Sequence, residues 1–164
     1  MTLEEVKYQI ALGTLDVKKV VNSRKTPKDV LSYFARSKNK YVRRLVARNT
    51  NTRILDLQLL SIDEDVIVIR GVAMNSSTPK VLLYDLANRN IYNIDIGLSR
   101  NPKLPFDLME KYSGKDQYSE IRYNIAKNKG TPIVLLKKIA HTYDPFLSQT
   151  IAQSRLMEMG VKND

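Results

Sequence analysis

Basic side chains recur along this chain at positions that could present a row of guanidinium groups. Arginine matches a phosphate with two parallel hydrogen bonds, so such a row suits a sugar-phosphate backbone. The candidate binding residues are Arg43, Arg44, Arg48, Arg70, Arg100, Arg122 and Lys127. The alternative interpretation is that these charges only keep an exposed helix face soluble.

Residues that could carry catalysis or hold a metal are scarce. His141, the single histidine, has no cysteine or metal-ligand spacing near it, which indicates a surface or helix-capping role. Asp63-Glu64-Asp65 is the densest acidic cluster, but calcium loops need further ligands at set offsets, so a solvated turn is favoured. The chain has no cysteine for thiolate metal sites or disulfides. We therefore expect no enzyme activity, no cofactor and no metal.

The net charge of +10 is concentrated in one early segment. Residues 18–53 hold twelve Lys or Arg against one acid, Asp29, whereas residues 54–164 hold fourteen bases and thirteen acids. A localised basic patch is typical of a protein with a polyanionic partner, here DNA, RNA or an acidic protein. A cationic surface that serves only solubility is the alternative.

Length and composition describe an ordinary folded chain. At 164 residues and 43% apolar content it has the size of one domain. No window approaches 18 consecutive apolar residues, so we expect no membrane span. The first residues include two acids and no basic-then-apolar run, so we expect no signal peptide and a cytoplasmic location.

One short segment repeats along the whole chain. It reads Asn or Ser, two variable residues, then usually Thr-Pro, as in Asn75-Ser76-Ser77-Thr78-Pro79. We call each copy a linker, and the linkers begin at Ser23, Asn49, Asn75, Asn101 and Asn128. Spacings of 26 and 27 residues indicate stacked supersecondary units. They predict one repeat domain with repeats at about 2–25, 26–51, 52–77, 78–103, 104–130 and 131–154, and a C-terminal cap at 155–164.

Each unit is predicted to begin with an α-helix. The linker threonine is expected to cap it, with proline at its first position. Apolar residues follow three, four, seven and eight positions later, the pattern of a helix that faces a core. These residues are Val30, Leu31, Phe34 and Ala35; Leu82, Leu83, Leu86 and Ala87; Leu108, Met109, Tyr112 and Ser113; Leu135, Leu136, Ile139 and Ala140. The first unit matches the pattern less closely. Thr2 and Glu5 form a capping box for its first helix, and Gly13 suits the left-handed conformation that ends a helix.

A second, shorter helix should complete each unit. Val42, Val46 and Ala47 and their counterparts up to Leu147, Ile151 and Ala152 fit about two turns, partly 3₁₀. With these residues inward, Arg43, Arg44 and Arg48 should point outward. The linker Asn would then close the helix in a left-handed conformation, its amide satisfying backbone groups.

The second unit departs from the pattern. Arg53 replaces the linker proline, and Asp56 occupies an apolar offset. We expect the helix that contains them to be rotated or shifted relative to its neighbours.

The segments Val42-Arg43-Arg44-Leu45-Val46-Ala47-Arg48-Asn49 and 75–83 resemble the bacterial leucine-rich repeat variant family. That family is all-helical, so the resemblance implies an all-α, right-handed α-solenoid of about six 26-residue repeats, each a long α-helix plus a short α or 3₁₀ helix. It also implies a binding scaffold without a defined ligand. Some members carry a cysteine-bound iron–sulfur cluster, which this chain cannot hold because it has no cysteine.

Two hypotheses of function follow. The shorter helices should lie at the smaller radius, so the basic row would line a concave surface and bind nucleic acid or another polyanion. Alternatively, the surface is a protein-interaction adaptor for an acidic or extended peptide, with Tyr92, Tyr118 and Tyr123 as anchors.

Overall fold

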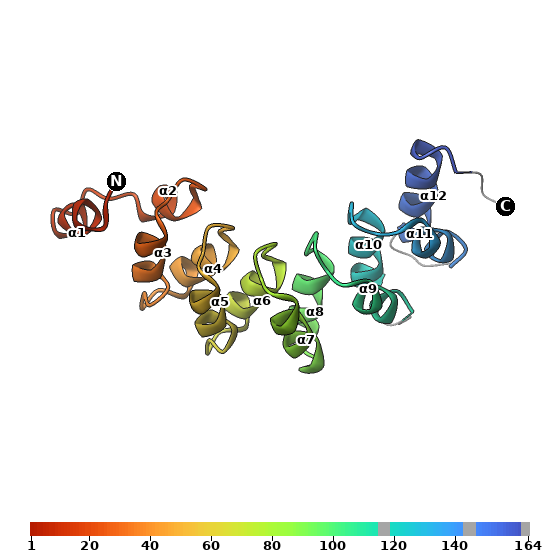
Figure 1. The fold of residues 1–164 in the computed structure, drawn as a ribbon, viewed down its shortest axis with the longest axis horizontal. Coiled ribbons are helices and arrows are strands. Elements are labelled where there is room, and N and C mark those ends of the chain that lie inside the picture. The colour runs from red at the N-terminus through yellow and green to blue at the C-terminus, as the bar shows by residue number, and fades with distance from the viewer. Residues whose placement is uncertain (115–118, 143–146, 162–164) are drawn as a thin grey trace. The chain divides into compact units, whose positions relative to one another are not determined.

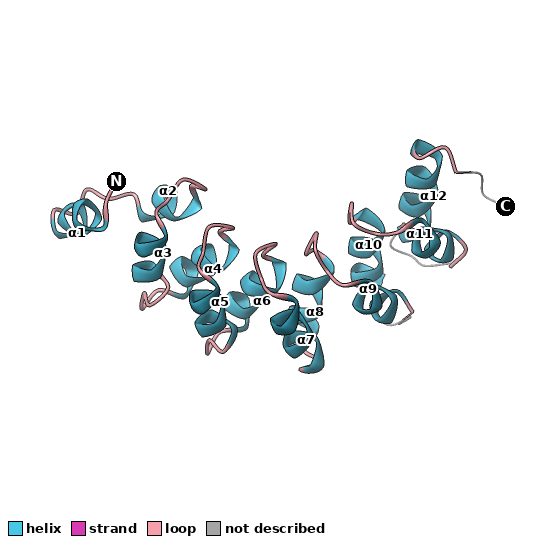
Figure 2. Ribbon diagram, viewed as in Figure 1, coloured by secondary structure: helices cyan, strands magenta, loops and turns pink. Residues whose placement is uncertain are grey.

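The computed structural model describes residues 1–114, 119–142 and 147–161, so Tyr118 lies outside the described residues. Within these ranges the chain forms twelve α-helices and no strand (Figures 1 and 2). The helices are α1 (Leu3–Ala11), α2 (Val17–Asn22), α3 (Lys28–Phe34), α4 (Lys40–Arg48), α5 (Ile54–Ser61), α6 (Val66–Met74), α7 (Lys80–Asn88), α8 (Tyr92–Ser99), α9 (Phe106–Ser113), α10 (Ser119–Lys127), α11 (Ile133–Ala140) and α12 (Ser148–Glu158). The predicted all-α class is confirmed.

The helices form two compact units, Met1–Leu82 and Leu83–Asp164, which we call the N-terminal and C-terminal units. In the N-terminal unit, α4 packs against both α2 and α6, while α3 and α5 each contact α4. In the C-terminal unit, α10 packs against α8, α9, α11 and α12. The second helices α2, α6 and α8 therefore pack chiefly on another second helix of their unit, whereas α12 packs most extensively on α11, the first helix of its own pair.

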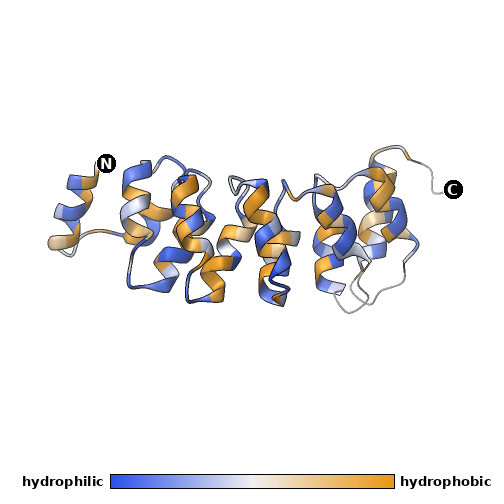
Figure 3. Ribbon diagram, turned by 60° about the horizontal axis from the view of Figure 1, so that its bottom comes forward, coloured by the Kyte–Doolittle hydropathy of each residue, from blue (hydrophilic) through white to orange (hydrophobic). Residues whose placement is uncertain are grey.

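The first helix of most pairs buries the predicted apolar face. Val30, Leu31, Phe34 and Ala35 of the α3 segment are all buried, and the four predicted positions of α9 and of α11 are buried as well. Figure 3 shows hydrophobic and hydrophilic residues alternating along the helices, as amphipathic helices require. In α1 only Val6 is buried, which agrees with a first unit that matches the repeat pattern less closely.

Helix α5 is not rotated, contrary to the prediction. It buries Asp56, Leu57, Leu60 and Ser61, the same offsets from Arg53 that its neighbours use from proline. Arg53 has φ −64° and ψ 149°, close to the φ −58° and ψ 148° of Pro27. The buried Asp56 carboxylate is satisfied because Ser32 donates a hydrogen bond to it and Arg36 lies 3.4 Å away. Asp56 therefore takes the inward position that an apolar residue holds in the neighbouring first helices.

The described second helices contain no 3₁₀ segment, so that part of the prediction is wrong, and only some of them are the shorter member of their pair: α2 has six residues against nine in α1. Helix α4 has nine residues against seven in α3. The side chains of Asn39 and Asp65 cap α4 and α6 and start them early, which lengthens both. At the chain end, α12 continues to Glu158 and includes the first residues of the predicted cap, of which Leu156 is buried. Leu147 was predicted to face inward but is exposed. It is the residue directly before α12 and has a left-handed backbone conformation, with φ 60°.

The linker asparagines connect successive helix pairs, but not in the predicted left-handed conformation. Asn49 and Asn75 are extended, with φ −73° and −76°. The Oδ1 of Asn75 accepts from the Ser77 N–H, while its Nδ2 donates to the carbonyls of Ala47 and Asn49 at 2.8 and 2.9 Å. Asn49 donates in the same way to Val21 and Ser23. The predicted role of the amide in satisfying backbone groups is confirmed.

An arginine takes over this role at the last linker of the C-terminal unit. Asn128 donates to the Asn101 carbonyl at 2.7 Å. Arg155 of α12 lies 27 residues after Asn128, and its Nη1 donates to the carbonyls of Ala126 and Asn128, each at 2.7 Å. These carbonyls are the counterparts of those that Asn75 binds, so a longer side chain ends the series with the same bonds.

The side chains of the linker threonines bond to the preceding helix and do not cap the next one. The hydroxyl of Thr78 donates to the Val72 carbonyl at 2.6 Å, and Thr52 and Thr131 bond in the same way six residues back. The following residue is the N-cap, such as Pro27, and it makes no side-chain cap bond. The threonine therefore closes the preceding helix. The capping box of Thr2 and Glu5 and the left-handed Gly13 (φ 68°) are confirmed.

Candidate nucleic-acid interface

Arg43 is buried, so its predicted outward position is wrong. The residue is 8% exposed, and its Nε and Nη2 donate to the two carboxylate oxygens of Asp63 at 2.7 and 2.9 Å. Its Nη1 donates to the carbonyls of Ser37 and Lys38. The hydrogen bonds that Arg43 donates to Asp63 raise the pKa of the Arg43 guanidinium. This arginine holds the turn between α3 and α4 against the turn before α6.

Arg122 occupies the corresponding place in α10, and its predicted place in the exposed basic row is wrong too. It is 1% exposed, and its Nε donates to the Ser113 carbonyl at 3.0 Å. The sequence did contain a signal for both residues. Arg43 lies three and four residues before Val46 and Ala47, and Arg122 stands likewise before Ile125 and Ala126. Residues at that spacing share a helix face, so both arginines belong to the inward stripe.

The acidic cluster at 63–65 is a set of ion pairs. Asp63 is largely buried against Arg43, which contradicts the solvated turn predicted for it, whereas Glu64 remains exposed. Asp65 pairs with Lys40 at 2.8 Å, and that hydrogen bond lowers the pKa of Asp65. Among the described residues, no group of three or more His, Asp or Glu side chains could hold a metal ion.

Arg44 and Arg48 lie on the exposed side of α4. With Tyr41 and Leu45 they form a stripe at intervals of three and four residues along one face. Arg48 is exposed and Arg44 half-buried. Neither forms an ion pair with a described residue, and the same holds for Lys18 and Arg24, in and after α2. Arg70 of α6 is half-buried.

Two cavities open between α2 and α4, and together we call them the α2/α4 groove. The first, of about 220 Å³, is lined by Val21, Asn22, Arg24, Leu45, Arg48, Asn49 and Thr50. The second, of about 430 Å³, is lined by Val17, Lys18, Asn39, Tyr41, Val42, Arg44 and Leu45. Leu45 is common to both, so the cavities are neighbours along α4. The groove thus holds four cations without a paired carboxylate.

A difference of one side chain distinguishes this groove from the packing of α4 on α6. The position of Leu45 corresponds to Gly71 in α6, one repeat later. A Cβ on Gly71 would lie 2.9 Å from the Ala47 Cβ and 3.2 Å from the Arg44 carbonyl oxygen. Helices α4 and α6 therefore meet backbone to backbone, whereas the leucine side chain lies in the space between α2 and α4.

The predicted residues of the C-terminal unit are engaged with neighbours. Arg100 pairs with Glu120 at 3.1 Å and contacts Asn124 at 3.3 Å. The ammonium of Lys127 lies 5.1 Å from the centre of the Tyr123 ring. Arg100 and Lys127 are both exposed, but one is neutralised and the other stacks on an aromatic ring.

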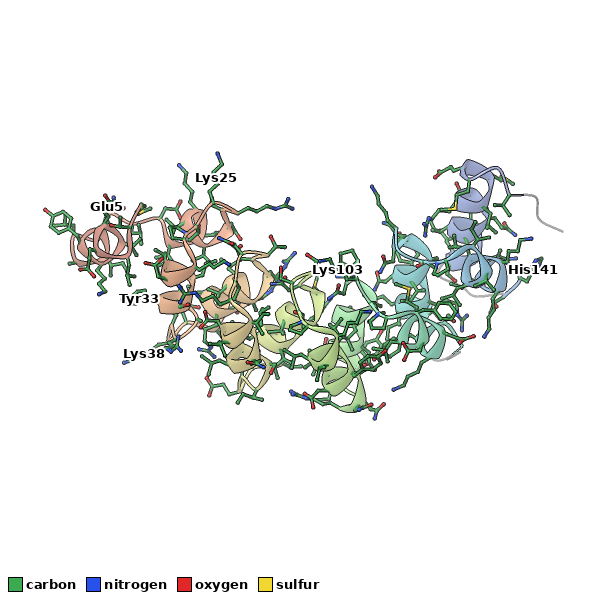
Figure 4. All side chains as sticks on the ribbon, in the orientation of Figure 1. Glu5, Lys25, Tyr33, Lys38, Lys103 and His141 are labelled. Atoms are coloured by element: carbon green, nitrogen blue, oxygen red, sulfur yellow. The ribbon has the colours of Figure 1, made fainter. Side chains whose placement is uncertain are left out.

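Figure 4 labels further basic and titratable side chains outside the groove. Lys25 lies in the linker before α3 and Lys38 in the turn after it, and both are exposed. His141 is exposed directly after α11, as the predicted surface role requires, and its backbone N–H donates to the Lys137 carbonyl.

Comparison with protein-family models, curated proteins and solved structures found no match to this chain. Among the described residues, no helix combines the length and apolar character needed to cross a membrane.

Proposed function

We propose that this chain is a non-catalytic scaffold that binds nucleic acid through the α2/α4 groove. One observation carries the proposal: Lys18, Arg24, Arg44 and Arg48 face one groove and have no carboxylate partner among the described residues. Unpaired cations remain available to phosphates, whereas cations already paired must first give up a partner. The surrounding segment 18–53 supplies most of the positive charge.

The proposed binding rests on phosphate contacts and should be sensitive to salt. Four cations that each neutralise one phosphate would release about four counterions, which gives a log–log salt slope of about −3 to −4. Sequence preference should be weak, because phosphate contacts carry no base information.

The direct test is a titration of fluorescently labelled DNA and RNA at several salt concentrations. Arg44→Glu with Arg48→Glu should weaken binding about a hundredfold, because two charge-assisted contacts are lost. Lys28→Glu with Lys80→Glu changes the net charge equally on exposed residues that begin α3 and α7, and serves as the matched control. Equal losses in both double variants, or no binding at low salt, would overturn the proposal.

A second candidate function is an adaptor for an acidic peptide. A groove of about 800 Å³ between α1 and α3 has apolar walls that include Leu3, Ile10 and Phe34, and Lys38 and Arg53 lie at it. Apolar grooves with a basic edge suit amphipathic segments with acidic flanks. A synthetic Leu/Glu helical peptide, titrated beside its scrambled form, tests this function, and equal weak binding of both peptides speaks against it.

We also propose that the helix pairs form a right-handed solenoid of about six 26-residue repeats, related to the bacterial leucine-rich repeat variant family. The recurring Asn and Thr bonds, separated by one linker spacing, support it. We propose a cytoplasmic location for this protein as well. Small-angle X-ray scattering of the full chain should give an elongated particle, and a compact sphere would exclude the solenoid.

A further inference from the structure

The two cavities of the α2/α4 groove differ in chemistry. The smaller cavity is polar, with the cations Arg24 and Arg48 beside the amide of Asn22 and the hydroxyl of Thr50. Guanidinium, amide and hydroxyl donors are the groups that commonly bind phosphate oxygens in nucleic-acid complexes. This cavity therefore matches one phosphate group.

The larger cavity is partly apolar and includes an aromatic ring. Val17, Val42 and Leu45 contribute its apolar surface, and Tyr41 lies at it beside Lys18 and Arg44. A planar nucleobase stacks on an aromatic ring in this kind of setting, and a nearby arginine adds to the attraction. This cavity therefore matches one base.

Tyr41 is not needed by the core of the N-terminal unit. It is 60% exposed, and its hydroxyl makes no hydrogen bond with a described residue. Tyr112, in contrast, is fully buried and donates to Asp95 at 2.7 Å. The ammonium of Lys40 lies 5.8 Å from the centre of the Tyr41 ring, which is otherwise exposed at the larger cavity and can stack a base, whereas Tyr112 has a structural role.

The cavities lie at a distance that suits neighbouring groups of one strand. Tyr41 and Arg48 are seven residues apart on α4, which is about 10 Å along the helix axis. In a duplex the bases are paired and stacked inside, so a base cannot enter a protein cavity without leaving the stack. A single strand can splay one base out while its phosphates stay on the cations.

We propose that the α2/α4 groove binds single-stranded nucleic acid, with one base against Tyr41 and a neighbouring phosphate between Arg24 and Arg48. This inference rests on the proposed function and narrows it to single strands. The shared chemistry of DNA and RNA strands, a base beside a phosphodiester, is what the groove selects.

The experiment compares labelled 12-nucleotide oligo-dT and oligo-U with a duplex of the same length, at one salt concentration. A single strand should bind at least tenfold tighter than the duplex. Tyr41→Ala should weaken single-strand binding about five- to hundredfold, the range found when a stacking ring is removed. Tyr41→Phe should keep the affinity, and Tyr8→Ala, which removes an equally exposed ring on α1, should leave it unchanged.

A tryptophan reporter gives a second readout. The chain has no tryptophan, so Tyr41→Trp would contribute the only indole fluorescence. Stacking of a base should quench it, with the same saturation as the anisotropy titration.

The outcomes separate the two proposals. If single strands and duplex bind equally, Tyr41→Ala has no effect and Arg44→Glu with Arg48→Glu still weakens binding, the single-strand inference is overturned and the proposed function stands. If none of the three nucleic acids binds at low salt, both are overturned. Absence of quenching in Tyr41→Trp during binding also overturns the inference.

Discussion

The two units carry similar basic side chains at equivalent positions but use them differently. Residues 1–82 contain fifteen Lys and Arg against eight acids, and residues 83–164 contain twelve against nine. In the N-terminal unit, Arg44 and Arg48 face a groove without acids. In the C-terminal unit, Arg100 pairs with Glu120, and Lys127 stacks on Tyr123.

The difference shows that the neighbourhood of a cation matters more than its place in the repeat. Arg43 and Arg44 are adjacent, yet one is buried in an ion pair and the other borders a cavity. A phosphate can be bound only where the guanidinium has not already been matched by a carboxylate. The following substitutions test this contrast.

The largest expected effect is on stability, from Arg43→Ala. Removing one partner of a buried ion pair leaves Asp63 uncompensated, which should lower the free energy of unfolding by about 3–5 kcal/mol. Arg44→Ala, one residue on, should change it by less than about 0.5 kcal/mol. Urea denaturation of both variants measures the difference. Similar unfolding midpoints for the two would contradict their separate roles.

Asn75→Ala should destabilise the N-terminal unit by about 2–3 kcal/mol. The substitution removes the bonds to the Ala47 and Asn49 carbonyls, and buried groups without partners are costly. Asn93→Ala on the exposed side of α8 is the control and should be close to neutral. Thermal denaturation followed by circular dichroism would show whether only the linker asparagine matters.

Gly71→Ala should cost about 1–2 kcal/mol, even though alanine favours helices. The new methyl group would meet Ala47 at 2.9 Å, and overpacking outweighs a propensity gain of about 1 kcal/mol. Among the described residues, a Cβ on Gly114 meets nothing closer than 3.9 Å, so Gly114→Ala serves as the control. A stabilised Gly71→Ala protein would show that α4 and α6 can move apart freely.

Glu120→Gln should make the C-terminal unit more like the N-terminal one. It removes the carboxylate that pairs with Arg100, and this exposed pair is worth at most about 1 kcal/mol. Affinity for single-stranded DNA should rise by about twofold. A larger gain would mean that the C-terminal unit has a binding site of its own.

The smallest expected effect is on the stability of the folded protein at acidic pH. The pKa of Asp65 is lowered in the folded protein, because Lys40 donates a hydrogen bond to it. Its contribution is therefore present above the ordinary Asp pKa of 3.8 and is lost as the pH falls below that value. Asp65→Asn keeps the helix cap but removes the charge, so urea denaturation should place its unfolding midpoint below that of the native protein at pH 7. The difference between the two proteins should narrow as the pH falls below 3.8.

Much of the fold could be predicted from residue spacing. The period of the linkers gave the helix pairs, and offsets from proline gave buried faces such as that of α3. The amide role of the linker Asn was predicted, but its backbone conformation and its particular partners could not be, since an extended Asn and a left-handed Asn suit the same sequence. The direction of each threonine bond depends on carbonyls of the preceding helix, which spacing does not place.

The candidate site was predicted less well. Arg44 and Arg48 lie where the helix pattern put them, but Arg43 and Arg122 do not. Charge suggested solvent exposure for all of them, whereas the spacing to Val46 and Ile125 placed two on the inward face. The carboxylates that pair with Arg43 and Arg100 lie about 20 residues away in the chain, so sequence alone could not connect them. Nor does it reveal the cavities beside Leu45.

The central claim is that the unpaired cations of the N-terminal unit bind nucleic acid. Its most direct test measures the affinity of Arg44→Glu with Arg48→Glu beside Arg100→Glu with Lys127→Glu, on one labelled oligonucleotide at one salt concentration. Both double variants lower the net charge equally. We predict a loss of about a hundredfold in the first and less than about threefold in the second. Equal losses, or a larger loss in the second, would contradict the claim.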